Sequence, residues 1–264
     1  MAPLVDAQAA ASSQMSGRLA AQIAALLAGF TGWYDDQAVA ALAARIAGLV
    51  APVQRATAAL TDAYLARTAT TIRGRSVRPA GPIPVAGLRA GVSLADAYSR
   101  LAGQYRYEVS QGTSPADALE HVTVRAEVMA GTDTALAMRG QSRKFMVERR
   151  VTGWRRVIHP ELSKGGTCGL CIVASHRLYK ADDLMPLHAR CSCVPTPVYG
   201  DDDPGSAINA ADLKAIYAAA GSTDAADLKR TRYTVHQHSE LGPQLVEAKA
   251  AWRGPAQVRA DSTH

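Results

Sequence analysis

Cysteine is scarce in this sequence: only four of the 264 residues are cysteines, and all four lie between positions 168 and 193. Aromatic residues are also few, at 5% of the chain, whereas alanine is abundant and apolar residues reach 48%. This combination favours helices that pack closely through small side chains over a β-sandwich. We therefore expect a mainly α-helical protein.

Long apolar runs and the common catalytic patterns are missing as well. The N-terminal stretch AAQIAALLAGF is broken by Gln22 and follows no basic start, so the sequence predicts neither a signal peptide nor a membrane span. In the cytoplasm thiols stay reduced, and clustered cysteines hold metal more often than they form disulfides. We find no Ser-His-Asp order, P-loop or catalytic carboxylate pair, so we do not expect an enzyme.

Positive charge is concentrated in one part of the chain. The formal net charge is +6, and residues 131–200 carry 11 basic against 5 acidic side chains. Such a basic block can attract phosphate or an acidic protein surface, and it is also typical of a solvated helix face. Without interleaved aromatics or a nucleic-acid motif, we favour a protein surface over DNA. The basic block consists mainly of Arg139, Arg143, Lys144, Arg149, Arg150, Arg155 and Arg156.

Residues 1–73 have the periodicity of a helical hairpin. Asp35 or Asp36 is placed to cap the second helix. Apolar residues in that helix recur every seven positions, which predicts a seam against a partner helix, most simply within the same chain. Pro52 lies inside this pattern and is expected to kink the helix. The two heptad series are Val39, Ile46, Val53 and Leu60, and Leu42, Leu49, Ala56 and Ala63.

Residues 74–92 are rich in proline, glycine and arginine and are expected to form an extended arm or linker. A helical region is predicted over 93–150, with N-terminal caps at Ser93 and Ser114 and a break near Gly131 or Gly140.

The remaining sequence divides into a small α+β module and a helical C-terminal part. VTGWRRVIHP and CVPTPVYG read as strands of the module, which covers residues 151–200. Residues 201–253 contain the string AADLK twice, fifteen residues apart, which predicts two short capped helices. The polar residues 254–264 are expected to be a disordered tail.

The four cysteines and one histidine have the spacing of metal ligands. Cys168 and Cys171 form a Cys-x-x-Cys pair, which presents two zinc ligands from one tight turn, and His188 precedes Cys191 by three residues. With Cys193, this gives five candidates for the four positions of a tetrahedral zinc ion. Residues two apart on a strand point to opposite faces, so Cys191 and Cys193 are not expected to bind together. We slightly favour Cys191, and both stay open.

Three other interpretations of the cysteines explain less of the sequence. A disulfide within the first pair fits poorly with a reducing cytoplasm. A catalytic thiol paired with His176 or His188 leaves three cysteines without a role. A zinc-supported nuclease of the His-Asn-His kind has His159 and His176, but no asparagine lies between residues 151 and 200. The sequence therefore favours a structural zinc site.

The order TCGLC, an insert, and then PLHARCSCVPTPV resembles the C-terminal motif of phage Mu F-like minor head proteins. The flanking strings YRYEVSQGTSPADALEHVTVRAE and HQHSELGPQLV resemble a branch found in tailed phages of actinobacteria, so the resemblance spans roughly residues 90–250. Ala189 stands where the family usually has proline, and Ser192 where it usually has arginine. Neither departure replaces a predicted ligand.

The resemblance implies a structural minor capsid protein with a structural zinc ion, found in the virion at the portal vertex or in the capsid interior. Its partners would be the portal protein, the major capsid protein, or both, with no membrane involved. The resemblance leaves open a homo-oligomer around the portal and non-specific contact with packaged DNA. The alternative function is a zinc-supported nucleic-acid-binding or nuclease-like processing factor.

Overall fold

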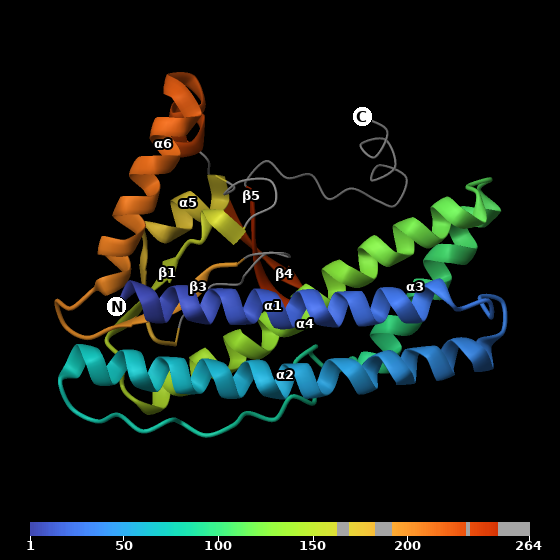
Figure 1. Cartoon of the computed structure of the whole chain (residues 1–264), viewed down its shortest axis with the longest axis horizontal. Helices are drawn as coiled ribbons and strands as arrows, with labels where there is room; N and C mark the ends of the chain where they lie inside the picture. The colour runs from blue at the N-terminus through green and yellow to red at the C-terminus, as the bar shows by residue number, and fades with distance from the viewer. Residues whose placement is uncertain (163–168, 183–191, 231–232, 248–264) are drawn as a thin grey trace.

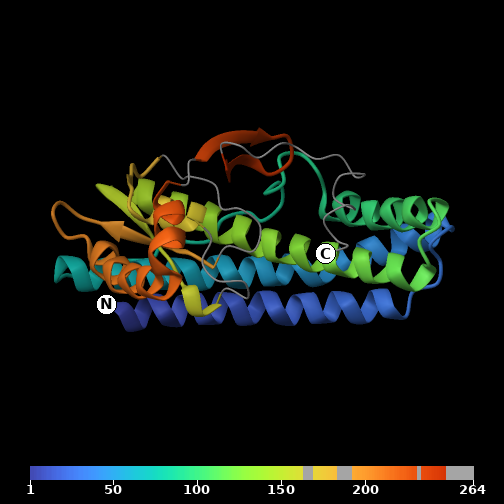
Figure 2. The ribbon, with the colours of Figure 1, turned by 90° about the horizontal axis from the view of Figure 1, so that it is seen from above.

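The computed structural model describes residues 1–162, 169–182, 192–230 and 233–247. Within these residues the chain forms six α-helices, a three-stranded sheet and a two-stranded hairpin. The predicted mainly α-helical class is confirmed. The long helices run along the length of the molecule, and the three-stranded sheet lies toward the end that carries the N-terminus (Figures 1 and 2).

Four helices build the body of the protein, and three of them have N-terminal caps where the sequence predicts them. The Asp35 carboxylate accepts hydrogen bonds from the backbone N–H groups of residues 37 and 38, at 2.9 and 3.2 Å. Ser93 and Ser114 each cap a later helix by accepting the N–H of the residue three positions on. The helices are α1 (Ala2–Ala28), α2 (Asp36–Arg73), α3 (Leu94–Ser110) and α4 (Pro115–Glu148).

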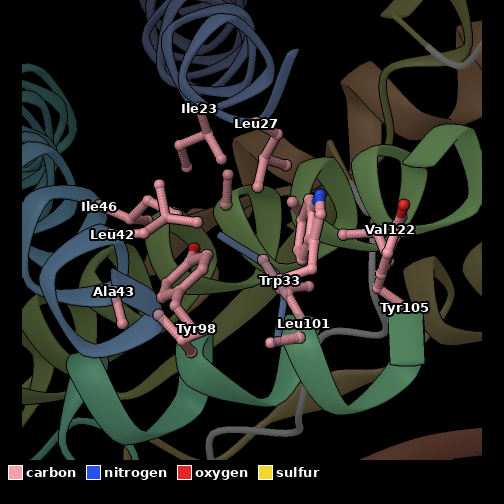
Figure 3. Close-up of a cluster of buried hydrophobic side chains, with 14 of the residues drawn as sticks. Ile23, Leu27, Trp33, Leu42, Ala43, Ile46, Tyr98, Leu101, Tyr105 and Val122 are labelled. Atoms are coloured by element: carbon pink, nitrogen blue, oxygen red, sulfur yellow. The ribbon is translucent and has the colours of Figure 1, made fainter. Parts of the chain in front are cut away.

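The core of this bundle is assembled from all four helices (Figure 3). The Trp33 ring, in the α1–α2 connection, stacks on Tyr105 of α3 with ring centroids 4.3 Å apart. Because α1, α2, α3 and α4 share one buried cluster, residues 1–73 and 93–150 pack as one helical body. Labelled members of the cluster are Ile23, Leu27, Leu42, Ile46, Leu101 and Val122.

The buried face of α2 departs from the predicted heptad seam. Val39, Leu42 and Ile46 are buried as expected, but Ala56 and Ala63 are exposed. Successive residues of the buried stripe are three or four positions apart, about 3.6 on average, as on a straight α-helix. Positions that repeat strictly every seven residues therefore drift around the helix and leave the buried face. The stripe contains Val39, Ala43, Ile46, Val50, Gln54, Thr57, Thr61, Leu65 and Thr68.

By length and composition, α2 is the one helix in the described part of the chain that could cross a membrane. The core helix of a soluble bundle passes the same test, and α2 packs against α1, α3 and α4 here. The helix also continues through Pro52, which is exposed. We therefore treat α2 as the central helix of the bundle.

The predicted break in α4 is wrong, because the helix runs without interruption through Gly131 and Gly140. Gly140 allows close packing instead, whereas a side chain at Gly131 would meet only an ordinary contact. A Cβ atom at Gly140 would lie 2.9 Å from Cδ1 of Ile83, and one at Gly131 would lie 3.6 Å from Oγ of Ser16. A glycine inside a helix can therefore mark a close neighbour as well as an end.

Residues 74–92 form no helix or strand, and they lie against their own chain. Asp62 of α2 accepts the N–H groups of Ala80 and Gly81, both at 2.8 Å. Gln141 of α4 accepts the Ile83 N–H and donates to the Gly81 carbonyl. The Asp62 carboxylate and the Gln141 amide thus form hydrogen bonds with main-chain groups of this segment. In a helix or a sheet, other main-chain groups would make these bonds.

A small antiparallel sheet with strand order β2-β1-β3 follows the bundle. Trp154 of β1 is opposite Tyr179 of β2, and Arg155 is opposite Thr196 of β3, whose hydroxyl lies 3.0 Å from Tyr64 of α2. Many buried side chains of this region belong to a cluster shared with α1, α2 and α4, so the predicted module rests on the bundle. Its elements are β1 (Gly153–Val157), the short helix Pro160–Leu162, α5 (Gly169–Ser175), β2 (Leu178–Tyr179) and β3 (Val194–Val198).

The prediction of short C-terminal helices over 201–253 is wrong. One helix, α6 (Pro204–Arg230), contains both AADLK strings, and a hairpin of β4 (Tyr233–His238) and β5 (Gly242–Glu247) follows it. Fifteen residues are about four helical turns, so the repeat fits one continuous helix. The predicted tail, 254–264, lies outside the described residues.

Candidate functional site

The structure places two of the five predicted zinc ligands in one buried cluster. Cys171 is the third residue of α5, and Cys193 immediately precedes β3. Their exposed fractions are 7% and 3%, and both belong to a small apolar cluster with Ile158, Ile172 and Leu213. One cysteine from each half of the motif therefore lies in the same part of the fold.

Helix α6 holds the elements on which these cysteines lie. The amide of Asn209 donates to the carbonyls of Arg156 and Ser175 and accepts the Ile158 N–H at 3.0 Å. Arg155 of β1 forms an ion pair with Asp203 and also donates to the carbonyls of residues 175 and 176 at the end of α5. These buried bonds join β1, α5 and α6 and so fix the position of Cys171.

The other three predicted ligands, Cys168, His188 and Cys191, lie outside the described residues. Within the part of the chain that the structure describes, no group of three or more His, Cys, Asp and Glu side chains forms a metal site. The five-residue ligand set stays a prediction. The slight preference for Cys191 over Cys193 also stays untested. Cys193 directly precedes β3, which is buried along its whole length, so Cys193 too can face the interior.

His159, His176 and Asn209 are the described residues of the kinds that a His-Asn-His nuclease uses in this region. His159 is buried, with Nδ1 2.9 Å from Oε1 of Glu161, whereas His176 is exposed. No asparagine lies within residues 151–200, but Asn209 of α6 packs beside β1 and α5. Its side-chain oxygen and nitrogen are both hydrogen-bonded to main-chain groups. Asn209 therefore has a structural role.

The basic block is divided among several environments instead of forming one surface. Lys144 pairs with Glu148 one turn along α4, and Arg149 donates to the carbonyls of Arg78 and Pro79. Arg155 pairs with Asp203, as described above. Much of the positive charge that the sequence places together is thus bonded within the chain.

Part of the basic block is nevertheless concentrated near α4 and β1. Burial lowers the pKa of Arg139, and the charges of Arg143 and Arg156 lower it further. The Arg156 side chain is buried, with its guanidinium 5.4 Å from the centre of the Trp154 ring. Arg143 is exposed. Three arginines therefore create a local positive potential.

A second polar group, which the sequence interpretation missed, lies inside the helical body. Asp133 of α4 is fully buried, and its carboxylate accepts bonds from Arg89 Nε at 2.7 Å and from the Tyr98 hydroxyl at 2.8 Å. Arg89 also pairs through Nη1 with Glu240, at 2.5 Å, and Arg100 pairs with the other oxygen of Glu240. This buried charge network joins residues 74–92, α3, α4 and the β4–β5 turn.

The charges of the network change one another's pKa values. Burial raises the pKa of Asp133, and it outweighs the effect of the bonds from Arg89 and Tyr98. Burial opposes the charged form of Arg89, yet the bond and charge of Asp133 raise the Arg89 pKa. Burial also works against ionised Glu240, but the bonds from Arg89 and Arg100 lower its pKa.

One signal for this network was present in the sequence. The buried face of α4 contains Ala118, Val122, Ala126 and Ala130, and Asp133 continues the same helical spacing. A carboxylate on an otherwise apolar stripe requires a buried partner. Nothing in the local sequence identifies that partner as Arg89, because the two residues are distant along the chain.

Comparison with known proteins adds no family to these observations. No protein-family model, curated protein or solved structure matches the chain. A functional conclusion therefore depends on the cysteine motif and on the geometry described above.

Proposed function

We propose that this chain is a structural minor component of a tailed-phage head, which contacts the portal and capsid proteins at the portal vertex or capsid interior and has a structural zinc ion. The resemblance of residues 165–198 to the minor head protein motif carries the proposal. The common buried cluster of Cys171 and Cys193 supports it, because the motif requires its two halves to meet.

The chemistry of the two described cysteines fits a structural zinc ion better than a catalytic one. Structural zinc sites are closed by four protein ligands, whereas catalytic sites keep a position open to water. Cys171 and Cys193 are buried among aliphatic side chains. Zinc held there would connect α5 to the segment before β3.

The shape of the molecule suits a protein that contacts more than one neighbour. Helix α2 has 38 residues, a length of about 57 Å at 1.5 Å per residue. The α1–α2 connection and α3 lie toward the end of the molecule opposite the three-stranded sheet (Figure 1). Tyr34 of this connection and Tyr107 of α3 are 67% and 44% exposed. Exposed tyrosines beside an arginine, here Arg106, are typical of protein interfaces.

We do not assign the attachment to partners to residues 74–92. The sequence indicates an arm that becomes ordered on a neighbouring subunit. In the structure the segment is bonded to α2 and α4 of its own chain. We therefore assign the contact with partners to the exposed end of the helical body.

Head assembly with the portal and major capsid proteins of the same phage tests the proposal. We expect the chain to sediment with assembled heads, and Tyr34→Ala to reduce its incorporation without changing its melting temperature. Leu178→Ala is the matched control, since Leu178 is an exposed apolar residue of β2, in the three-stranded sheet. A folded wild-type chain that never associates with heads would contradict the proposed function.

The alternative is a zinc-supported nucleic-acid-binding or nuclease-like factor. The positive potential around Arg139 and Arg143 is the observation in its favour. It would require binding to DNA that is independent of sequence and strongly dependent on salt.

A further inference from the structure

A cavity of about 550 Å³ that opens to solvent lies between α2 and residues 85–95, in the helical body. Its lining is mostly small and aliphatic, with Ala47 and Ala51 on the α2 side and Leu88 and Val92 on the other. The volume is in the range of small-ligand sites, which is roughly 300–1,000 Å³. The cavity is therefore large enough for one or two amino-acid residues, and too small for a helix.

Two buried polar side chains line this cavity and have incomplete hydrogen bonding. Gln54 and Arg89 are 0% and 5% exposed. Among the described residues, neither Oε1 of Gln54 nor Nη2 of Arg89 has a hydrogen-bond partner. Buried polar groups are almost always paired, so each of these two atoms requires an explanation.

Both side chains are held in place by the same residue. Gln54 Nε2 donates to the main-chain carbonyl of Asp133 at 3.3 Å, and Arg89 Nε donates to its carboxylate at 2.7 Å. Arg89 Nη1 is bonded to Glu240. The remaining acceptor and donor are thus held in position by bonds to other parts of the chain.

We propose that this cavity binds a peptide amide of a partner polypeptide, next to a small aliphatic side chain. The amide N–H would donate to Gln54 Oε1, and the amide carbonyl would accept from Arg89 Nη2. The aliphatic side chain would pack against Ala47 and Ala51. An anion would satisfy Arg89 but provide no donor for Gln54, and a cation would do the reverse.

A nucleobase edge also combines a donor with an acceptor, but the lining argues against it. Proteins that bind unstacked bases place them on aromatic rings or on an arginine plane. The lining residues include no aromatic side chain. Aliphatic walls with one amide-pairing position match a polypeptide better.

The wall formed by residues 85–95 contains three residues with positive φ. Gly87 and Gly91 have φ angles of 84° and 88°, and Ala90 lies between them with φ of 25°. Positive φ is unfavourable for alanine, so the local conformation is held by its surroundings. Since Gln54 Oε1 and Arg89 Nη2 are closed to water, an occupant must shift part of this wall to reach them.

The proposal does not depend on zinc or on the phage resemblance. If the proposed head function is correct, the cavity supplies a second attachment point besides the exposed tyrosines. If the cavity binds none of the probes described below, the result of the head-assembly experiment is unaffected. A failure of the cavity proposal can therefore be told apart from a failure of the proposed head function.

Binding of isovaleramide to the full-length, zinc-loaded protein tests the chemistry. This probe combines an aliphatic group with a primary amide, and methyl isovalerate is the matched ester without an N–H donor. We expect millimolar binding of the amide, with NMR shifts confined to residues 47–54 and 85–95. The ester should bind roughly tenfold more weakly, because it leaves Gln54 unpaired.

Two substitutions on α2 locate the site. Ala51→Leu should fill the cavity and abolish amide binding, whereas Ala59→Leu, at an exposed position of the same helix, should leave it unchanged. Gln54→Met should remove the preference for the amide over the ester. Unchanged melting temperatures would show that each variant is folded. If a variant does not fold, the comparison of amide with ester in the unmodified protein still tests the proposal.

The acetylated and amidated tripeptide glycyl-valyl-glycine tests the source of the amide. We expect it to bind at the same residues, more tightly than isovaleramide. Equal binding of amide and ester, or equal binding by the two leucine variants, would overturn the proposal. Binding of isovaleramide without the tripeptide would overturn the polypeptide assignment and leave a site for small amides.

Discussion

Arg89 and Asp133 are 44 residues apart in the sequence, yet Nε of Arg89 lies 2.7 Å from Oδ1 of Asp133, and both side chains are buried. Taking two charges out of water is costly, and the cost is recovered only if each charge keeps its partners. Here Tyr98 and Glu240 provide the further bonds. The pair therefore connects residues 74–92 to the centre of the bundle.

Removing one member of this pair should be strongly destabilising. Asp133→Ala leaves the buried Arg89 charge without its main partner, and we expect the free energy of unfolding to fall by about 3–5 kcal/mol. Asp117→Ala is the control on the same helix, because Asp117 is exposed and we expect a loss of at most about 1 kcal/mol. Urea unfolding followed by circular dichroism measures both. Equal losses in the two variants would contradict a special role for Asp133.

Glu240 should make stability depend on acid. Its pKa is lowered in the folded state, so ionised Glu240 stabilises the protein above its unfolded pKa of about 4.3, and this stabilisation is lost as the pH falls further. Glu240→Gln should lower the melting temperature at pH 7 and differ progressively less from the unmodified protein between about pH 5 and pH 3. The raised pKa of Asp133 acts in the opposite direction; burial is its main cause and the Glu240 charge adds to it, so Glu240→Gln relieves part of that rise.

Glu148→Gln is the control for that pH series. Glu148 forms an exposed pair with Lys144, and such surface pairs contribute little. The melting temperatures of Glu240→Gln and the unmodified protein are compared from pH 7 to pH 3. If their difference stays constant over this range, the ionised carboxylate is not what stabilises the fold.

Asp62 should determine whether residues 74–92 stay against the body. Asp62→Ala removes the acceptor for two main-chain N–H groups, which should cost about 1–3 kcal/mol. Hydrogen exchange should show lost protection at Ala80 and Gly81. Thr71→Ala, which removes an exposed bond within α2, should leave that protection unchanged. Full protection in the Asp62 variant would mean that other contacts hold the segment.

Zinc should bind in one equivalent and stabilise the region around α5. Chelation should lower the melting temperature, and added zinc should restore it, because metal binding is coupled to folding. Cys171→Ser should abolish stoichiometric zinc, and a comparison of Cys191→Ser with Cys193→Ser identifies the fourth ligand. Since this region shares a core with α1, α2 and α4, we expect the helical body to stay folded without metal. A metal-free protein with an unchanged melt would exclude the zinc site.

Duplex DNA titration at two salt concentrations separates the two proposed functions. If the arginines near α4 meet an acidic protein, binding to DNA should be weak even at low salt. If they meet DNA, affinity should be independent of sequence and fall by about 10³-fold or more between 50 and 200 mM salt for six or more phosphate contacts. Arg143→Ala should then reduce the salt dependence, whereas Arg45→Ala, at an exposed position of α2, should not.

The sequence by itself determined the local features of this protein. The helical class, the caps at Ser93, Ser114 and either Asp35 or Asp36, and the strands on either side of the cysteines all follow from side chains that act within a few residues. Their physical signals are short-range: a hydroxyl or carboxylate that satisfies a helix N–H, and the alternation of a strand. The cysteine spacing is local in the same sense, and it indicates a metal site without showing its assembly.

Only the tertiary structure decided how these local elements meet. Gly140 reads as a helix end in the sequence, and it is the contact with Ile83 that makes it a point of close packing. Residues 74–92 read as a free arm until Asp62 and Gln141 supply partners for their main chain. Cys171 and Cys193 share a cluster because α6 packs against α5 and β1. Each outcome depends on groups distant in sequence, whose pairing is set by the burial of apolar surface and by the need to satisfy every buried polar group.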